Sequence, residues 1–247
     1  MDPLILLNRM CQMTESLVLI PARKGSKRLP GKNTLVFEGV PMIAWSIRAA
    51  QRSTQVTNII VSTDDEKVAE IAEKEGAKVQ WRPEHLAGDH CSMLAVLQFT
   101  VEKLRKKECH IPEFLILLQP TSPLRELGLI DNALTKITEN PEADMLIELV
   151  SQKLHSGKVV DGFWHSDFSE NTRSQDLPEI FYPSGRLFIY RISKTVDVGS
   201  ESGSKTIVQQ AAFNENINID EQSDIDKLSI VFARNKDKFA YLIKQPA

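Results

Sequence analysis

Short apolar runs that alternate with helical patterns constrain the fold of this chain more than any other feature of its sequence. Residues 17–20 and 114–118 have the apolar character of buried strands, and the second of them, FLILL, is the stronger pattern. Residues 58–63 and the short segment 78–81 also predict strands. Apolar residues recur at helical spacing through residues 92–107. This alternation is typical of βαβ units, whose strands run parallel. We therefore expect an α/β fold with a doubly wound, mostly parallel sheet.

Two further helices are predicted from the residues that would begin them. Pro41 suits a first helical turn. Asp64 and Asp65 stand where an N-cap is needed, ahead of an apolar helical face that ends near Gly76. Both helices would lie between predicted strands, as the α/β pattern requires.

The chain of 247 residues suffices for one large α/β domain. We divide it into an N-terminal tail, residues 1–15, and a domain, residues 16–247. Residues 151–185 are weakly periodic and predict an inserted arm or lid rather than sheet. Residues 186–191 return to strand character, and residues 224–244 predict a closing helix.

The composition argues against several classes of partner. With 30 basic and 33 acidic residues, the chain has no overall charge that would attract nucleic acid or an acidic membrane. Its three cysteines form no close pair, and no stretch approaches the roughly 20 apolar residues of a spanning helix. We expect a cytoplasmic protein with neither a nucleic-acid nor a membrane partner. Whether Met1 or Met13 is the functional start stays open.

A basic loop with two glycines follows the first predicted strand. Residues 21–33 read PARKGSKRLPGKN and hold five cations. Ligands of open α/β sheets bind beyond the carboxyl ends of the strands, where glycines let backbone N–H groups approach phosphate oxygens. Arginine and lysine supply the matching charge. The position of the loop favours a polyphosphate cradle over a merely solvated basic loop.

Other nucleotide and hydrolase motifs are not met. Five residues separate Gly25 from Gly31, where a P-loop has four, and Asn33 stands where the P-loop needs Ser or Thr. The chain also lacks the GxGxxG pattern in this loop, the HExxH pattern and the GxSxG elbow. ATP hydrolysis, hydride transfer and hydrolase chemistry are therefore not favoured.

The same loop fits the signature PAR-x-x-S-K-x-x-P-x-K-N at every fixed position, and the sequence resembles the acylneuraminate cytidylyltransferases, which activate sialic acid and related nonulosonic acids. The resemblance continues with residues 61–65 (VSTDD), residues 82–89 (RPEHLAGD) and residues 118–125 (LQPTSPLR), and it covers roughly residues 16–240. It implies a Rossmann-like nucleotidyltransferase that transfers CMP from CTP to the anomeric hydroxyl of the sugar acid and releases pyrophosphate.

The resemblance also implies roles for single residues on the nucleotide side. Arg23 and Lys32 would bind the triphosphate and serve catalysis, and Asn33 would lie near the nucleotide. Arg82 would face the base and phosphates, with Ser92 close by. Taken singly, Arg82 could equally be a surface charge before a proline, so the set of matches carries the interpretation.

On the sugar side, the resemblance places Gln119 against the incoming sugar acid and Arg173 against its carboxylate. Two departures fall in this region. Ser174 replaces the second of two arginines, and residues 183–188 read PSGRLF where the family has PNGAIY. The identity of the sugar acid therefore stays open. The arm would help to form a homodimer and cover the neighbouring active site.

Magnesium is the cofactor that the resemblance implies, because a family motif of the form D-x-D aligns with residues 218–220. Asp220 matches, whereas Asn218 replaces the first carboxylate and brings no charge. Asp89 is a candidate for the missing carboxylate, although a loop or capping role is at least as well supported. Asp220 itself could be a helix cap.

We therefore expect an enzyme whose partners are CTP, a nine-carbon sugar acid and a second copy of the chain. Two alternatives stay open. One is a related sugar nucleotidyltransferase, for 3-deoxy-manno-octulosonate or another sugar and with another nucleoside triphosphate. The other is a non-catalytic protein that binds nucleotide sugars, which Asn218 and Ser174 make conceivable. Magnesium-dependent release of pyrophosphate distinguishes enzyme from sensor.

Overall fold

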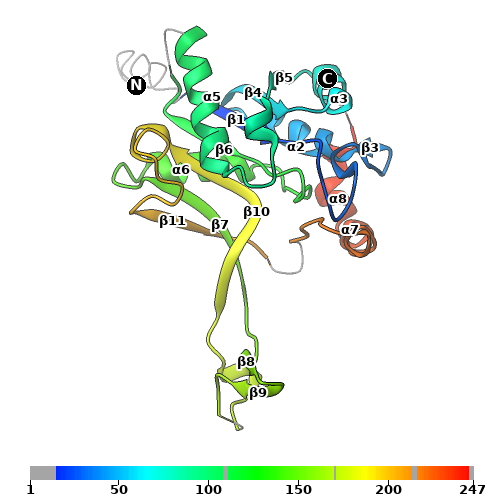
Figure 1. Cartoon of the computed structure of the whole chain (residues 1–247), viewed down its shortest axis with the longest axis vertical. Coiled ribbons are helices and arrows are strands. Elements are labelled where there is room, and N and C mark those ends of the chain that lie inside the picture. Colours follow the sequence, from blue (N-terminus) through cyan, green and yellow to red (C-terminus); the bar gives the residue numbers. More distant parts are fainter. Residues whose placement is uncertain (1–14, 108–110, 170, 213–215, 245–247) are drawn as a thin grey trace, which may run out of the picture.

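The computed structural model describes residues 15–107, 111–169, 171–212 and 216–244 (Figure 1). The predicted N-terminal tail, residues 1–15, lies outside the described residues except for its last member. The question of Met1 or Met13 as the start also falls outside them.

A seven-stranded sheet forms the centre of the fold. Its strands are β1 (Ser16–Pro21), β4 (Val56–Thr63), β5 (Lys78–Trp81), β6 (Phe114–Leu117), β7 (Met145–Gln152), β10 (Ile180–Arg191) and β11 (Thr206–Gln210). They lie in the order β11-β7-β10-β6-β1-β4-β5 (Figure 1). β1 pairs in parallel with β4 and β6, β4 with β5, and β11 with β7, whereas β10 is antiparallel to both of its neighbours. The expected mostly parallel sheet is confirmed.

Helices cover both faces of this sheet. They are α2 (Met42–Gln51), α3 (Glu66–Lys74), α4 (Glu84–Ala87), α5 (Met93–Lys107), α6 (Leu129–Thr138), α7 (Gln222–Arg234) and α8 (Lys236–Phe239). Along β1, Val18 and Ile20 belong to the apolar cluster under α2, α3 and α6, whereas Leu17 and Leu19 belong to the cluster under α5. Successive strand residues point to opposite faces, so a strand covered on both sides must be apolar throughout. The doubly wound architecture is thereby confirmed.

The capping signals of the sequence are also confirmed. The Asp65 side chain caps α3 by accepting hydrogen bonds from the backbone N–H groups of Lys67 and Val68. Pro41 is the N-cap of α2, so that helix begins where its proline predicted. Both helix starts place the preceding loops at the carboxyl ends of β1 and β4.

A third apolar cluster attaches the end of the chain to the sheet. Trp45 of α2 packs edge-on against Phe232 of α7, and Phe37 contacts both rings. Phe37 belongs to a short hairpin, β2 (Val36–Phe37) and β3 (Val40–Pro41). Ile219 is buried in the same cluster and donates its backbone N–H to the Thr121 carbonyl at 2.7 Å. The segment before α7 is therefore held beside the loop that follows β6.

The arm departs from the prediction. Residues 151–185 were expected to lie outside the sheet, but β7 continues to Gln152 and β10 already begins at Ile180. These strand ends run away from the body as a ribbon that carries a hairpin, β8 (Gly157–Val160) and β9 (Phe163–Ser166) (Figure 1). The first four residues of β10 are largely exposed. A ribbon without a buried face has no reason to alternate apolar and polar residues, so the periodicity gave no strand signal.

Other elements differ from the predictions as well. The single closing helix expected over residues 224–244 is wrong, because α7 ends at Arg234 and is followed by α8 and a 3-10 turn, η5 (Ala240–Leu242). Asn235 interrupts the helix with φ −125° and donates its side-chain amide to the Val231 carbonyl. The sequence analysis also did not identify α6, β7 and β11. In the described part of the chain, no helix has the length and apolar character needed to cross a membrane.

Candidate active site

The cleft lies where the sheet changes its winding direction. From β1 the chain adds β4 and then β5 on one side, and it returns to place β6 on the other side of β1. The loops that follow β1 and β6 diverge at this point and leave a crevice, as in other open α/β sheets. The crevice has a volume of about 520 Å³. Its lining comprises Pro21, Arg23, Gly25, Ser26, Lys27, Arg28, Lys32, Asn33, Arg82, Met93, Gln119, Pro120, Thr121, Asn218 and Asp220.

Two cations of the first loop share one carboxylate. Arg23 Nη1 lies 2.6 Å from Asp89 Oδ1, and Lys27 Nζ lies 2.5 Å from Asp89 Oδ2. The hydrogen bonds from Lys27 and Arg23 lower the pKa of Asp89 to about 2. Asp89 therefore stays ionised at neutral pH and acts as a resident anion for these two cations. From the sequence, Asp89 was a candidate metal ligand or a helix cap, and its pairing with Arg23 and Lys27 was not predicted.

The other two cations at the cleft contact Asp220. Lys32 Nζ lies 3.2 Å from Asp220 Oδ1 and donates to the Ile219 carbonyl at 3.1 Å. Arg28 Nη2 lies 3.0 Å from Asp220 Oδ2. The basic loop and the carboxylate from the far end of the chain therefore face the same cleft, 188 residues apart in sequence.

Asn33 shapes the first loop from inside. Its side chain is buried, and its amide Nδ2 donates to the Arg23 carbonyl at 3.2 Å. Asn33 belongs to the 3-10 turn η1 (Lys32–Thr34), which follows Gly31 with φ +70°. Only glycine adopts that conformation without strain, so Gly31 sets the angle at which Lys32 enters the cleft.

Arg82 reaches the cleft from the end of β5 and is anchored to β4. Its Nε donates to Ser62 Oγ at 3.1 Å, and its Nη2 donates to the Ser62 carbonyl at 3.2 Å. Burial lowers the pKa of the Arg82 guanidinium, with Asp64 opposing that effect. Ser92 lies just before the cleft-lining Met93, and its Oγ accepts the backbone N–H of Ala95 at 3.2 Å. Ser92 thus caps the start of α5 and adjoins the cleft lining.

Gln119 lies at the tip of β6 on the opposite wall. Its carbonyl accepts from Arg125 Nη2 at 2.9 Å and from the Ser122 backbone N–H at 3.1 Å. Arg125 is fully buried and also donates to Ser46 Oγ. Burial, followed by the neighbouring charge of Arg186, lowers the pKa of Arg125 to about 9. Arg125 therefore holds the loop after β6 from behind, a role that its place at the end of the LQPTSPLR motif did not reveal.

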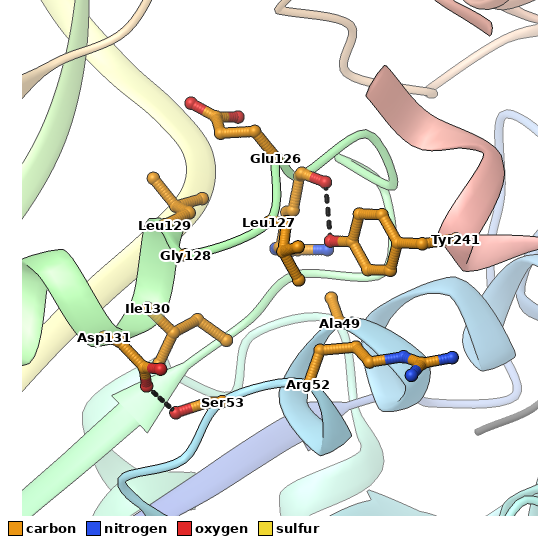
Figure 2. Close-up of a pocket in the computed structure, with 11 residues that line it drawn as sticks. Ala49, Arg52, Ser53, Glu126, Leu127, Gly128, Leu129, Ile130, Asp131 and Tyr241 are labelled. Atoms are coloured by element: carbon orange, nitrogen blue, oxygen red, sulfur yellow. Dashed lines mark hydrogen bonds between the residues drawn. The ribbon is translucent and has the colours of Figure 1, made fainter. Parts of the chain in front are cut away.

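A second hollow in this region is too small for a substrate. Figure 2 shows it between α2, the loop before α6 and Tyr241. Its volume of about 10 Å³ admits about one water molecule. Tyr241 Oη donates to the Arg125 carbonyl at 2.8 Å, and burial raises the Tyr241 pKa to about 12. The residues around this hollow therefore support the loop after β6.

Two predicted site residues are not part of the cleft lining: Ser92 adjoins it, whereas Arg173 lies on the arm. It precedes a 3-10 turn, η2 (Ser174–Asp176), on the arm. Its Nε lies 2.7 Å from Asp176 Oδ2, and its side chain is 70% exposed. Arg173 therefore contributes nothing to the cleft of its own chain in this structure.

Within the unusual segment 183–188, residues 184–187 are buried. Arg186 is 1% exposed and forms an ion pair with Glu126, and its Nε lies 3.5 Å from Glu148. The Ser184 hydroxyl donates to Glu148 Oε2 at 2.6 Å. Burial raises the pKa of Glu148, and the Ser184 hydrogen bond opposes this. Neither Ser184 nor Arg186 lines the cleft. The departure from the family sequence at residues 183–188 therefore changes residues that pack behind the cleft and not residues that line it.

The oxygen ligands at the cleft fit a magnesium ion that arrives with phosphates. Asn218 Nδ2 lies 3.1 Å from Asp220 Oδ2, so the two residues of the altered D-x-D motif are adjacent. Mg²⁺ is usually held by one or two carboxylates together with substrate phosphates and waters. Among the described residues, no group of three or more His, Cys, Asp or Glu side chains could hold a metal. One lining carboxylate, already paired with two of the five lining cations, suits an ion shared with phosphates rather than a preformed metal site.

The arrangement therefore suits a polyanion that carries its own metal. Five cations line one cleft, four from the loop after β1 and Arg82 after β5, and Gln119 lines the same cleft. Lys27 and Arg28 are functional candidates to which the sequence analysis gave no role of their own. Their charge and their place in the loop were the signal that could have identified them.

Comparisons with known proteins agree with this geometry. Residues 17–229 match the protein family described as cytidylyltransferase. The chain is 30% identical to pseudaminic acid cytidylyltransferase of Campylobacter jejuni over 180 residues, which is 70% of this chain and 77% of that protein. A shorter match of 42% identity over 118 residues relates it to CMP-N,N'-diacetyllegionaminic acid synthase of Legionella pneumophila, over 47% of this chain and 50% of that one.

A solved structure shares the fold. CMP:2-keto-3-deoxy-manno-octonic acid synthetase, complexed with CTP, superimposes with a TM-score of 0.65 at 19% identity, over 90% of this chain and 99% of that one. A likeness at this identity speaks for the Rossmann-like architecture alone. With the family match over residues 17–229 and the 30% identity to a full-length relative, this chain belongs to the cytidylyltransferase family.

Proposed function

We propose that this protein transfers CMP from CTP to the anomeric hydroxyl of a sialic-acid-like nonulosonic acid. The observation that carries the proposal is the shared cleft, which is lined by four cations of the loop after β1, by Gln119 and by Asp220, with two of the cations in contact with Asp220. The names of the relatives, which include a pseudaminic acid cytidylyltransferase, support the choice of CTP and of a nonulosonic acid.

In this reaction, the residues of the protein position the substrates and neutralise the charge that develops. The anomeric hydroxyl oxygen attacks the α-phosphorus and loses its proton to solvent, while the bond to the bridging oxygen breaks and pyrophosphate leaves with that electron pair. In this proposal Arg23 and Lys32 bind the triphosphate, Asn33 holds the loop in shape, and Arg82 faces the nucleotide. Gln119 receives the sugar acid on the other wall. Donors that are fixed before the reaction stabilise developing charge without reorganisation.

Magnesium is part of the proposal. Asp220 would hold it, with the Asn218 amide oxygen or a water in the second position, and Mg²⁺ would neutralise charge that develops on the phosphate oxygens. Because Lys32 and Arg28 contact both Asp220 oxygens in this structure, the phosphates must first draw these cations away. The carboxylate would then become available to the ion.

The test is pyrophosphate release. The purified protein is incubated with each of the four nucleoside triphosphates, Mg²⁺ and a panel of nonulosonic acids that also includes 3-deoxy-manno-octulosonate. We expect release with CTP and one or more nonulosonic acids only. Release with 3-deoxy-manno-octulosonate alone would move the protein to the related synthetases, and nucleotide binding without release under all conditions would contradict an enzymatic function.

We also propose that the arm pairs two copies of the chain. The hairpin at its tip exposes large apolar side chains, with Phe163 73%, Trp164 59% and Val159 70% exposed. Large apolar side chains that are exposed together on one small hairpin indicate an interaction site. A homodimer would bury it and would bring Arg173 toward the partner's cleft. Sedimentation analysis should give a dimer for the wild type and a monomer for Phe163→Ser/Trp164→Ser.

A mixing experiment tests the role of Arg173 across the dimer. Arg173→Ala and Asp220→Asn are each expected to be inactive. If Arg173 serves the partner's cleft, mixed dimers contain one intact site, and activity returns when the two inactive variants are mixed and refolded together. Absence of any recovery in dimers shown to be mixed would contradict the role in trans.

A further inference from the structure

The strand β10 bends away from β7 directly behind Gln119. Its pairing with β7 is regular up to Pro183 and resumes at Phe188 with a register shift. Bulges of this kind are common beside active sites, where they redirect the chain. Here the bulge carries Ser184, Gly185 and Arg186 toward the loop that follows β6.

Buried hydrogen bonds fix the bulge to the sheet and to the loop. The Ser184 hydroxyl donates to Glu148 Oε2 at 2.6 Å and accepts the Arg186 backbone N–H at 3.1 Å. The Ser122 hydroxyl donates to the Ser184 carbonyl at 3.2 Å. Because Ser122, Glu148 and Ser184 are each at most 1% exposed, water does not compete for these bonds.

Arg125 connects the same bulge to Gln119. Its Nε donates to the Arg186 carbonyl at 2.8 Å, and its Nη2 donates to the Gln119 carbonyl at 2.9 Å. The planar guanidinium therefore fixes the spacing between the bulge and the backbone of Gln119.

Gly185 is the point at which the bulge reaches the Gln119 side chain. A Cβ atom on Gly185 would lie 2.9 Å from Gln119 Oε1 and 2.6 Å from Ser122 Oγ. Both distances are shorter than van der Waals contact allows, so the present position of the Gln119 amide requires a residue without a side chain. Gly185 also has φ +76°, which favours glycine independently.

We propose that Gly185 is a positioning residue for the sugar acid, because it leaves the space that the side-chain amide of the cleft-lining Gln119 occupies. This inference rests on the proposed function, in which Gln119 contacts the acceptor. It extends that function by assigning acceptor recognition to the bulge of β10 as well as to the cleft wall.

The matched pair Gly185→Ala and Gly39→Ala tests the proposal. Both glycines have φ +76°, but a Cβ on Gly39 meets nothing within 4 Å, so Gly39→Ala carries the backbone strain alone. We expect Gly185→Ala to lower kcat/KM for the sugar acid by roughly 10- to 100-fold, the scale of a misplaced binding group, with KM for CTP nearly unchanged. Gly39→Ala should leave both constants near wild type. Equal behaviour of the two variants would overturn the proposal.

A double-mutant cycle with Gln119→Ala asks whether Gly185 acts through Gln119. In the Gln119→Ala background, Gly185→Ala should cause a clearly smaller loss toward the sugar acid than in the wild type, because the Gln119 amide that it displaces is gone and only the contact with Ser122 Oγ remains. Additive losses would overturn the proposal. Ser184→Ala, which weakens the same bulge without a clash, gives a milder loss in the same direction if Gly185→Ala does not fold.

A readout without turnover separates this inference from the proposed function. The side-chain amide resonance of Gln119, assigned by its absence in Gln119→Ala, should shift in Gly185→Ala and stay in place in Gly39→Ala. If the wild-type protein releases no pyrophosphate with any acceptor, the proposed function fails. If the resonance is the same in both glycine variants, the positioning role fails.

Discussion

Replacement of Arg23 by alanine should disable nucleotide use, and the structure indicates how part of the loss can be restored. Arg23, Lys27 and Asp89 form one ionic group with a net charge of one positive. Arg23→Ala makes that group neutral and removes a donor from the cleft. Loss of one fixed donor to a developing oxyanion costs about 10²- to 10³-fold in kcat. We expect a loss of that order in kcat/KM for CTP, measured as pyrophosphate release at saturating sugar acid.

The second substitution, Asp89→Asn, tests the charge argument. It returns the group to one positive charge, so Arg23→Ala/Asp89→Asn should recover roughly tenfold over Arg23→Ala, a typical coupling between contacting residues. Asp89→Asn alone should lower KM for CTP, because Arg23 and Lys27 no longer have a competing anion. Arg105→Ala is the control, since Arg105 forms a similar exposed pair with Asp197 outside the cleft lining. Near-wild-type rates in Arg23→Ala, or no recovery in the double variant, would refute this reasoning.

Three further outcomes are expected. Asn218→Asp should lower the Mg²⁺ concentration for half-maximal activity by about tenfold, because added ligand charge raises metal affinity; an unchanged requirement would exclude position 218 from the metal site. Glu75→Ala should lower the free energy of unfolding by about 3–5 kcal/mol and Tm by roughly 6–20 °C in thermal melts, because it removes the carboxylate partner of the buried Arg48 guanidinium. A small shift in Tm would show that water hydrates the Arg48 guanidinium instead. Asp144 has a pKa of about 2, lowered from 3.8 mainly by the hydrogen bond from the Ser204 hydroxyl. Its ionised form therefore stabilises the fold above pH 4, and this contribution is lost as the pH falls from 4 to 2. In Asp144→Asn, the free energy of unfolding should depend less on pH in this range, and an acid transition identical to that of the wild type would contradict the assignment.

The strand that was most clearly predictable is one whose residues are buried on both sides. Residues 114–118 showed a continuous apolar run, and the fully buried β6 lies there. β5 lies at residues 78–81 as predicted, although it is a largely exposed strand at the edge of the sheet. The start of β10 on the arm was missed because strand residues exposed on both faces need no alternation. The break at Asn235 was missed because helical spacing continues on both sides of it, and only its backbone angles and its own hydrogen bond end the helix.

The candidate site divides in the same way. Residues on the loop after β1 could be placed from position and charge, since a strand end fixes where the following loop must lie. The pairing of Arg23 with Asp89 could not, because residues 66 apart meet only through the packing of the sheet. Arg186 is the clearest case. In sequence it was an added charge near the sugar acid, whereas in the structure it is buried beside Glu148 and Glu126.

When the nucleotide binds, the cations of the cleft should therefore exchange their carboxylate partners for phosphate groups. In this structure, Asp89 and Asp220 form ion pairs with the four cations that would meet a triphosphate. A monoanion offers these cations no more than the carboxylates do, whereas a triphosphate replaces both carboxylates at once. The exchange leaves Asp220 without its cationic partners beside a cluster of phosphate oxygens, which is an environment that attracts Mg²⁺. Nucleotide and metal should therefore bind as one unit, because each creates the site that the other requires.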